Sequence, residues 1–215
     1  DAYGRRTAVT EPDKGRSSFT YNGKGLVECT TTPGEITCQT YDDAGRRIKL
    51  TKDSTSGETL ATYTYDTGTN GVGKLASVTD ESGTREFDYD ALTGNVTNMK
   101  RTYTHQGRTK HFDIVHTYTP GGLLERKEYP ALNLTLNYDY YPGGFLKRVT
   151  LIDPDRRILD SGSTLVLASY GVPDAMGTVP SVTYANGVTV DYTYEATTGK
   201  MRTLKASTVA NGTIA

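Results

Sequence analysis

The sequence predicts an all-β protein built from tandem β-hairpins. Three observations lead to this prediction: a Tyr-Asp phrase that recurs along the chain, a second turn signal between its copies, and the composition. The 215 residues include 16 Tyr and 23 Gly, but no Trp and only 4 Phe. Tyr favours pleated surfaces, whereas Gly favours turns. Hydrophobic residues make up 35% of the chain, below the roughly 45–50% of ordinary soluble domains. We therefore expect a thin structure without a thick core.

The recurring phrase consists of Tyr, often Asp, two or more further residues, Gly, a long or basic residue and an aliphatic residue. Its clearest copy runs from Tyr41 to Ile48. Copies start at positions 21, 41, 65, 89, 118, 140, 170 and 194, and those at 21 and 170 are weaker. The residues that define the six clearer copies are Tyr41, Asp42, Gly45, Tyr65, Asp66, Gly73, Tyr89, Asp90, Gly94, Tyr118, Gly122, Tyr140, Gly144, Tyr194 and Gly199.

The residue types of the phrase suit a turn between two strands. Asp can accept a hydrogen bond from backbone that follows it, and Gly adopts positive φ without a steric penalty. We expect the recurrent Tyr side chains to stack across neighbouring hairpins, which contributes about 0.2–1 kcal/mol for each pair.

A second turn signal lies midway through each period. Its examples are Thr55-Ser56-Gly57-Glu58, Glu81-Ser82-Gly83-Thr84, His105-Gln106-Gly107-Arg108 and Ala185-Asn186-Gly187-Val188. Asn-Gly between alternating segments is a strong hairpin signal. Residues 182–184 and 188–194 show the alternation of half-buried strands. One period therefore reads strand, turn, strand, turn, and no window shows helical periodicity with caps.

The repeats occupy residues 1–215 as a single array of about eight to nine copies. The segment that starts at Asp1 reads as a copy without its leading Tyr, so we expect the chain to be part of a longer array. A lone hairpin is marginal in water, and each repeat would be stabilised mainly by its neighbours.

The two cysteines, Cys29 and Cys38, are equidistant from the Pro33-Gly34 step. If that step centres a hairpin, the cysteines face each other at a separation that permits a disulfide. A disulfide and a reduced pair both remain open.

Charge argues against a nucleic-acid partner, and hydropathy argues against a membrane-spanning segment. Lys plus Arg number 24 and Asp plus Glu number 25, interspersed along the chain. No basic block indicates a nucleic-acid partner. No apolar run approaches the roughly 18 residues of a membrane span. The first residues lack the features of a signal peptide.

No catalytic, cofactor or metal site is predicted, and we expect the chain not to be an enzyme. His105, His111 and His116 fall close together, but alternation along a strand separates the last two. Residues 66–71 resemble a calcium loop only faintly, since Ser77 stands where a closing acidic residue belongs. The numerous aspartates are explained by turns, and the Gly-x-Ser-x-Gly and phosphate-loop motifs are absent.

The phrase Tyr-Asp-x-x-Gly-Arg, repeated every twenty-odd residues, resembles the Rhs or YD-repeat proteins. Residues 182–188, followed by Tyr192-Thr193-Tyr194, are especially similar to that family. The resemblance implies a β ribbon that forms a hollow shell around a toxin or effector domain in bacterial toxin complexes and Rhs effectors. Some members cleave themselves at an Asp-Pro-x-Gly site. Here Asp153-Pro154 is followed by Asp155-Arg156, so that activity is not transferred.

The leading functional hypothesis is a structural shell segment that helps to encapsulate a toxin. Its expected partners are other segments of the same shell, a toxin-complex subunit and the enclosed domain. We expect secretion, or delivery by a secretion system. The alternative is a cell-surface adhesion module that recognises carbohydrate or protein, as the related teneurin barrels imply. The triplets that start at Asn95, Asn133 and Asn211 are compatible with this alternative, but such triplets arise by chance in a Thr-rich chain and are not counted in its favour.

Overall fold

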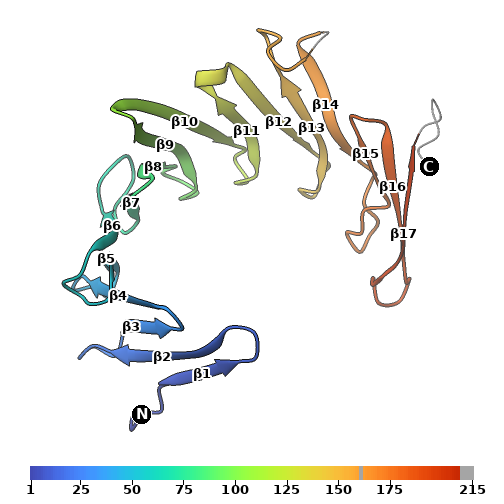
Figure 1. The fold of residues 1–215 in the computed structure, drawn as a ribbon. Coiled ribbons are helices and arrows are strands. Elements are labelled where there is room, and N and C mark those ends of the chain that lie inside the picture. The colour runs from blue at the N-terminus through green and yellow to red at the C-terminus, as the bar shows by residue number, and fades with distance from the viewer. Residues whose placement is uncertain (160–161, 209–215) are drawn as a thin grey trace. The chain divides into compact units, whose positions relative to one another are not determined.

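The computed structural model describes residues 1–159 and 162–208. These residues form seventeen β-strands and one short 3₁₀ helix, with no α-helix among them (Figure 1). Strands that are consecutive in the chain pair antiparallel. The all-β prediction is therefore confirmed. By its internal contacts the chain divides into two compact units, Asp1–His111 and Phe112–Ala215, called the first and second unit.

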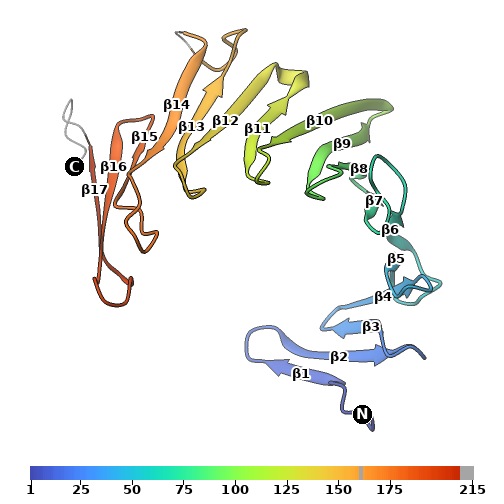
Figure 2. The ribbon, with the colours of Figure 1, turned by 180° about the vertical axis from the view of Figure 1, so that it is seen from behind.

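The first unit holds the strands up to β9 and the beginning of β10 (Figure 2). Its strands are β1 (Ala8–Glu11), β2 (Gly15–Tyr21), β3 (Val27–Thr32), β4 (Glu35–Tyr41), β5 (Arg47–Lys52), β6 (Thr59–Tyr65), β7 (Leu75–Asp80), β8 (Gly83–Tyr89) and β9 (Val96–His105).

The second unit holds most of β10 and all later strands. Its elements are β10 (Arg108–Tyr118), β11 (Leu124–Tyr129), the 3₁₀ helix η1 (Pro130–Leu132), β12 (Leu134–Tyr140), β13 (Leu146–Ile152), β14 (Thr164–Tyr170), β15 (Ser181–Tyr184), β16 (Val188–Tyr194) and β17 (Met201–Thr208). No helix among the described residues is long and apolar enough to cross a membrane.

The tyrosines that start the repeat all occupy one position in the fold. Each is the last residue of an even-numbered strand, from Tyr21 at the end of β2 to Tyr194 at the end of β16. The phrase that follows forms the connection to the next odd-numbered strand, which we call a Tyr-Asp turn. The predicted second turns connect β5 to β6, β7 to β8, β9 to β10 and β15 to β16.

A register shift accompanies these tyrosines. In seven of the strand pairs the shift lies at the last step before Tyr, as at Thr40/Tyr41 and Thr193/Tyr194. One extra residue in a strand disrupts the ladder locally and increases the twist. The repeat therefore sets a bend at the start of each of these turns.

The core is thin, as the composition predicted. In each unit the described strands form a single layer (Figure 1). Most strand residues are only half-buried, and β17 is exposed throughout. The buried hydrophobic residues are Cys38, Ala61, Ala76, Leu134, Leu151, Ala168 and Val182. Such a layer depends on strand pairing and on contacts between turns.

Asp153 organises the connection between β13 and β14. Its carboxylate is fully buried and accepts backbone N–H bonds from Arg157, Ile158 and Leu159 at 3.1, 2.7 and 3.0 Å. Burial alone would raise the pKa of this carboxyl, but the three backbone donors outweigh burial and lower it. The Asp-Pro step noticed in the sequence thus holds a loop in place.

Gly83 gives a test of the backbone geometry at a second turn. Its φ is 120°, and a Cβ there would collide with the carbonyl oxygen of Thr102 in β9. We expect Gly83→Ala to lower the free energy of unfolding by about 2–4 kcal/mol, from strain and displaced backbone. Urea denaturation measures the change. Gly23→Ala is the matched control, because open space surrounds that position. Equal effects of both substitutions would contradict this account.

Candidate functional site: the interlocked Tyr-Asp turns

The turn at Asp42 shows how the phrase folds locally. The Asp42 N–H donates to the Arg46 carbonyl at 2.9 Å, and the Gly45 N–H donates to the Asp42 carbonyl at 3.1 Å. The Arg46 N–H donates to Asp42 Oδ1 at 2.8 Å. Gly45 has a φ of 80°, a conformation that L side chains rarely adopt. Asp and Gly are thus required by the geometry of the turn.

The same framework recurs with different side chains as acceptors. Asn22 Oδ1 accepts from the Leu26 N–H at 3.0 Å, and Thr119 Oγ1 accepts from the Leu123 N–H at 3.1 Å. Asp174 Oδ1 accepts from the Thr178 N–H at 3.0 Å. The first position therefore favours a short acceptor rather than Asp itself, and Tyr141 and Glu195 occupy it in turns that make the same backbone bonds. This explains why the phrase is only often Tyr-Asp.

The Tyr of one repeat commonly bonds to the backbone at or just before the start of the strand that follows the preceding Tyr-Asp turn. Six of these hydroxyls donate to a backbone carbonyl two residues after the glycine of that earlier turn. The pairs are Tyr21 to Arg6 at 2.6 Å, Tyr41 to Val27 at 2.6 Å, Tyr65 to Arg47 at 2.8 Å, Tyr89 to Leu75 at 2.7 Å, Tyr140 to Leu124 at 2.7 Å and Tyr194 to Val179 at 2.9 Å.

A basic side chain makes the reverse connection, from one turn forward to the next. The Arg46 Nε donates to Asp42 Oδ2 in its own turn at 2.7 Å. Its two terminal nitrogens donate to the Asp66 carboxylate in the next turn at 2.9 and 2.7 Å. The guanidinium lies 4.4 Å from the centre of the Tyr65 ring. One Arg thus holds two aspartates and one tyrosine from successive repeats.

These contacts perturb the acidic groups in the expected direction. The Arg46 guanidinium, followed by the Gly73 N–H, lowers the pKa of Asp66 to about 2. The Arg46 backbone N–H is the largest cause of the lowered pKa of Asp42. Both carboxylates are therefore ionised across the physiological pH range, as the ion pairs require.

The expected stacking of tyrosines between hairpins is replaced by contacts with cations. Arg5 lies 4.3 Å from the centre of the Tyr21 ring, and Lys74 lies 4.5 Å from that of Tyr89. Each cation follows the glycine of the preceding turn. The stacked pair Tyr192–Tyr194, at 6.4 Å, lies within one strand. Because each Tyr hydroxyl reaches back to the preceding repeat, the ring face lies beside that repeat's basic residue.

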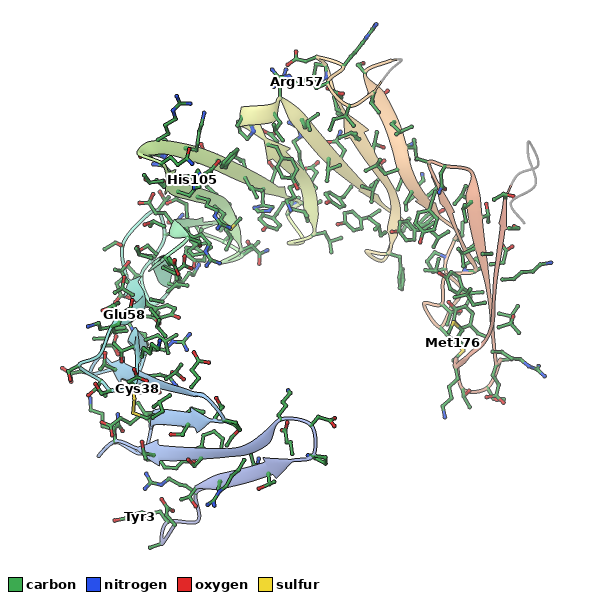
Figure 3. The ribbon with its side chains drawn as sticks, viewed as in Figure 1. Tyr3, Cys38, Glu58, His105, Arg157 and Met176 are labelled. Carbon is green, nitrogen blue, oxygen red and sulfur yellow. A yellow bond between two sulfur atoms is a disulfide. The ribbon has the colours of Figure 1, made fainter. Side chains whose placement is uncertain are left out.

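Cys29 and Cys38 lie directly opposite each other in β3 and β4, with Cα atoms 4.0 Å apart. They form a disulfide across the hairpin, and Cys38 is fully buried (Figure 3). Gly34 in the connecting turn has a φ of 92°.

The histidines take separate roles. His105 ends β9, whereas His111 Nδ1 lies 3.0 Å from Thr102 Oγ1. The ring of His116 stacks beside Tyr118, and burial followed by the charge of Lys127 lowers its pKa. Within residues 1–159 and 162–208, no group of three or more His, Cys, Asp or Glu side chains is placed to hold a metal ion. The suggested calcium loop is a lengthened Tyr-Asp turn, closed by the Asp66 contacts with Gly73 and Arg46.

Two of the three Asn-x-Thr triplets lie within the described residues. Asn95 accepts the closing backbone bond of the turn that starts at Asp90. Asn133 follows η1 with a φ of 51°. Asn211 lies outside the described residues.

The sequence matches no protein-family model and no curated protein. Solved structures share its fold. A crystal structure of TcdB2-TccC3-Cdc42 has a TM-score of 0.73 at 17% identity, over 95% of this chain and 11% of that chain. TcdB2-TccC3 without the hypervariable C-terminal region gives the same values. A Photorhabdus luminescens Tc holotoxin pore with a substitution in TccC3 has a TM-score of 0.73 at 17% identity, over 95% of this chain and 10% of that one. The chain thus spans only 10–11% of the length of these matches, and the likeness is one of fold.

The hydroxyl bond between repeats can be tested at Tyr41. We expect Tyr41→Phe to lower the free energy of unfolding by about 1 kcal/mol, because the part-buried Val27 carbonyl loses its donor. Tyr63→Phe is the control: Arg47 lies 4.4 Å from the centre of that ring, and the Tyr63 hydroxyl has no hydrogen bond with the described residues. Urea denaturation compares the two, and a Tyr63 effect as large as that of Tyr41 would contradict the interpretation.

The Arg46 bridge predicts a dependence of stability on pH. The pKa of Asp66 is about 2 in the folded chain, below its value of about 3.9 in unfolded peptides. The contribution of the ionised Asp66 carboxylate to the free energy of unfolding is therefore complete above the pKa of the unfolded chain, and it is lost as pH falls through the pKa of the folded chain. Denaturation between pH 5 and pH 2 should show stability falling less steeply in Asp66→Asn than in the wild type. Parallel profiles would show that the bridge does not act in solution.

Proposed function

We propose that this chain is a wall segment of an Rhs or YD-repeat shell, which encloses a toxin or effector domain and performs no catalysis itself. Both units belong, in this proposal, to one array of eight to nine repeats within a longer shell. The partners are other segments of the shell, a toxin-complex subunit and the enclosed domain. The assembly is secreted or delivered by a secretion system.

The observation that carries this proposal is the two-way connection between successive Tyr-Asp turns. Six of the turns offer a backbone carbonyl to the tyrosine of the next repeat, as the turn before Val27 does for Tyr41. Where a basic residue follows the turn glycine, it also covers that ring, as Arg46 covers Tyr65. Such a unit can be extended by adding further copies, because each repeat is completed by its neighbours. This is what a wall requires.

The thin layer supports the same reading. A single sheet exposes two faces. Both faces can be in contact with solvent if they carry many charged side chains, and a near-equal number of positive and negative charges limits repulsion between them. The charges number 24 and 25, and most strand residues keep partial exposure. The shared fold with chains from TccC3-containing toxin complexes adds support, because it places the same architecture in proteins whose names describe toxins.

The test uses the full-length gene product that carries residues 1–215. We expect limited proteolysis to leave a second domain intact in the folded protein and to degrade it after unfolding. Arg46→Leu removes contacts to two aspartates and should increase cleavage of that domain several-fold. Arg126→Leu is the matched control, since Arg126 contacts only Glu128 of its own strand among its charged partners.

Two outcomes would overturn the proposal. One is a full-length product without a second domain, and the other is a second domain that is digested equally fast before and after unfolding. If that protein instead bound immobilised glycans through residues 1–215, the adhesion alternative would replace encapsulation.

A further inference from the structure

A polar pocket of about 300 Å³ lies in the first unit, on strands β6 to β9. Four of its side chains come from β8 and β9, in register: Glu86 pairs with Lys100, and Asp88 pairs with Asn98. Residues two apart on a strand lie on one face, so these side chains form a square on the sheet. This volume is at the lower end of the range for small-molecule sites.

The square is extended by two hydroxyls. Ser77 of β7 pairs in register with Glu86, and Thr64 of β6 pairs with Ser77. The Thr64 and Ser77 hydroxyl oxygens lie 2.8 Å apart. The pocket therefore combines carboxylates, hydroxyls, an amide and one ammonium group from four consecutive strands.

A lengthened Tyr-Asp turn supplies one wall. The turn that starts at Asp66 ends at Lys74, whereas the turn that starts at Asp42 ends at Arg46. Its additional residues lie over β8, where the Thr69 N–H donates to Asp88 Oδ1 at 2.9 Å. A Cβ at Gly68 would lie 3.1 Å from the Phe87 carbonyl oxygen, so the turn packs tightly there.

Asn98 gives an independent indication that the pocket receives a hydrogen-bond donor. Its Oδ1 is buried and accepts no hydrogen bond from the described residues. A buried acceptor without a donor costs about 1–3 kcal/mol. Asn98 lines the pocket, and its side-chain amide could rotate so that Oδ1 faces the pocket. This rotation would break no hydrogen bond to Oδ1 and would allow Oδ1 to accept one from a ligand.

The charges indicate which donor. Glu86 and Lys100 lie 3.7 Å apart and offset each other, whereas the Asp88 carboxylate accepts a hydrogen bond from the Thr69 N–H and forms no salt bridge within the described residues. The pocket is left with one net negative charge and mostly acceptor atoms. An ammonium group supplies three donors and a positive charge, which matches this set.

We propose that this pocket binds a small organic ligand through a primary ammonium group, held by Asp88, Asn98 and Glu86. One wall of the pocket belongs to the turn that Arg46 holds through Asp66, but Asp88, Asn98 and Glu86 take no part in the Arg46 contacts or the tyrosine hydroxyl bonds on which the proposed wall function rests. Either proposal can therefore fail without the other.

The experiment uses 1,4-diaminobutane as the probe and 1,4-butanediol as its uncharged counterpart of equal length. In NMR titrations of the chain, we expect diaminobutane to shift the amide resonances of Ser77, Asp88 and Asn98, and butanediol at the same concentration to leave them unchanged. Equal shifts with both probes, or no shift with diaminobutane, would overturn the proposal.

Two substitutions locate the binding. Asp88→Asn keeps an acceptor for the Thr69 N–H but removes the charge, and should weaken diaminobutane binding at least about tenfold. Asp191→Asn makes the same chemical change on β16 and should leave the affinity unaltered. Retained diaminobutane affinity in Asp88→Asn, with an unchanged far-ultraviolet circular dichroism spectrum, would exclude this site.

Discussion

The structure depends on one connection, the contact between each Tyr-Asp turn and the next. The tyrosine hydroxyl reaches back to a strand carbonyl, and in several repeats a basic side chain reaches forward over the following ring. Neither contact is strong alone, since a hydrogen bond contributes about 0.5–1.5 kcal/mol and an exposed cation–π contact about 0.5–1 kcal/mol. Six tyrosines make the hydroxyl bond, and the rings of three of them, Tyr21, Tyr65 and Tyr89, are covered by a cation from the preceding turn. Within each unit these contacts join neighbouring copies at one end of their strands.

This connection explains why so thin a layer can fold. The buried hydrophobic residues are few and mostly small, such as Ala61, Ala76 and Ala168. A single layer cannot bury large side chains on both faces. The polar contacts between Tyr-Asp turns therefore supply part of the stabilisation that a second layer provides in a β-sandwich. It also explains the charge balance, because each bridging Arg or Lys is matched by turn carboxylates.

Much of the fold could be predicted from spacing alone. The tyrosines that mark the repeat end the even strands because each period contains two strands and two turns, even though the length of the turns varies. The placement of Cys29 opposite Cys38 followed from symmetry about Pro33-Gly34. The partners of the tyrosines could not be predicted, since they depend on how neighbouring turns are offset. A signal was present in the basic residues after the turn glycines, Arg5, Arg46 and Lys74. The square that Glu86, Asp88, Asn98 and Lys100 form could not be predicted either. Predicting it would have required the exact register of β8 and β9, and an error of one residue in that register would have paired different side chains.

The hairpin disulfide closes a short loop, because its two cysteines are nine positions apart in the sequence. Loop closure of this size restricts the unfolded chain by about 3 kcal/mol in the entropic model. Its larger consequence concerns alignment. A slip of one residue would turn every side chain of a strand to the opposite face. The disulfide makes such a slip impossible between β3 and β4. Because pairing proceeds from each strand to its neighbour, this hairpin can serve as the fixed reference from which the two faces of the sheet in the first unit are assigned during folding.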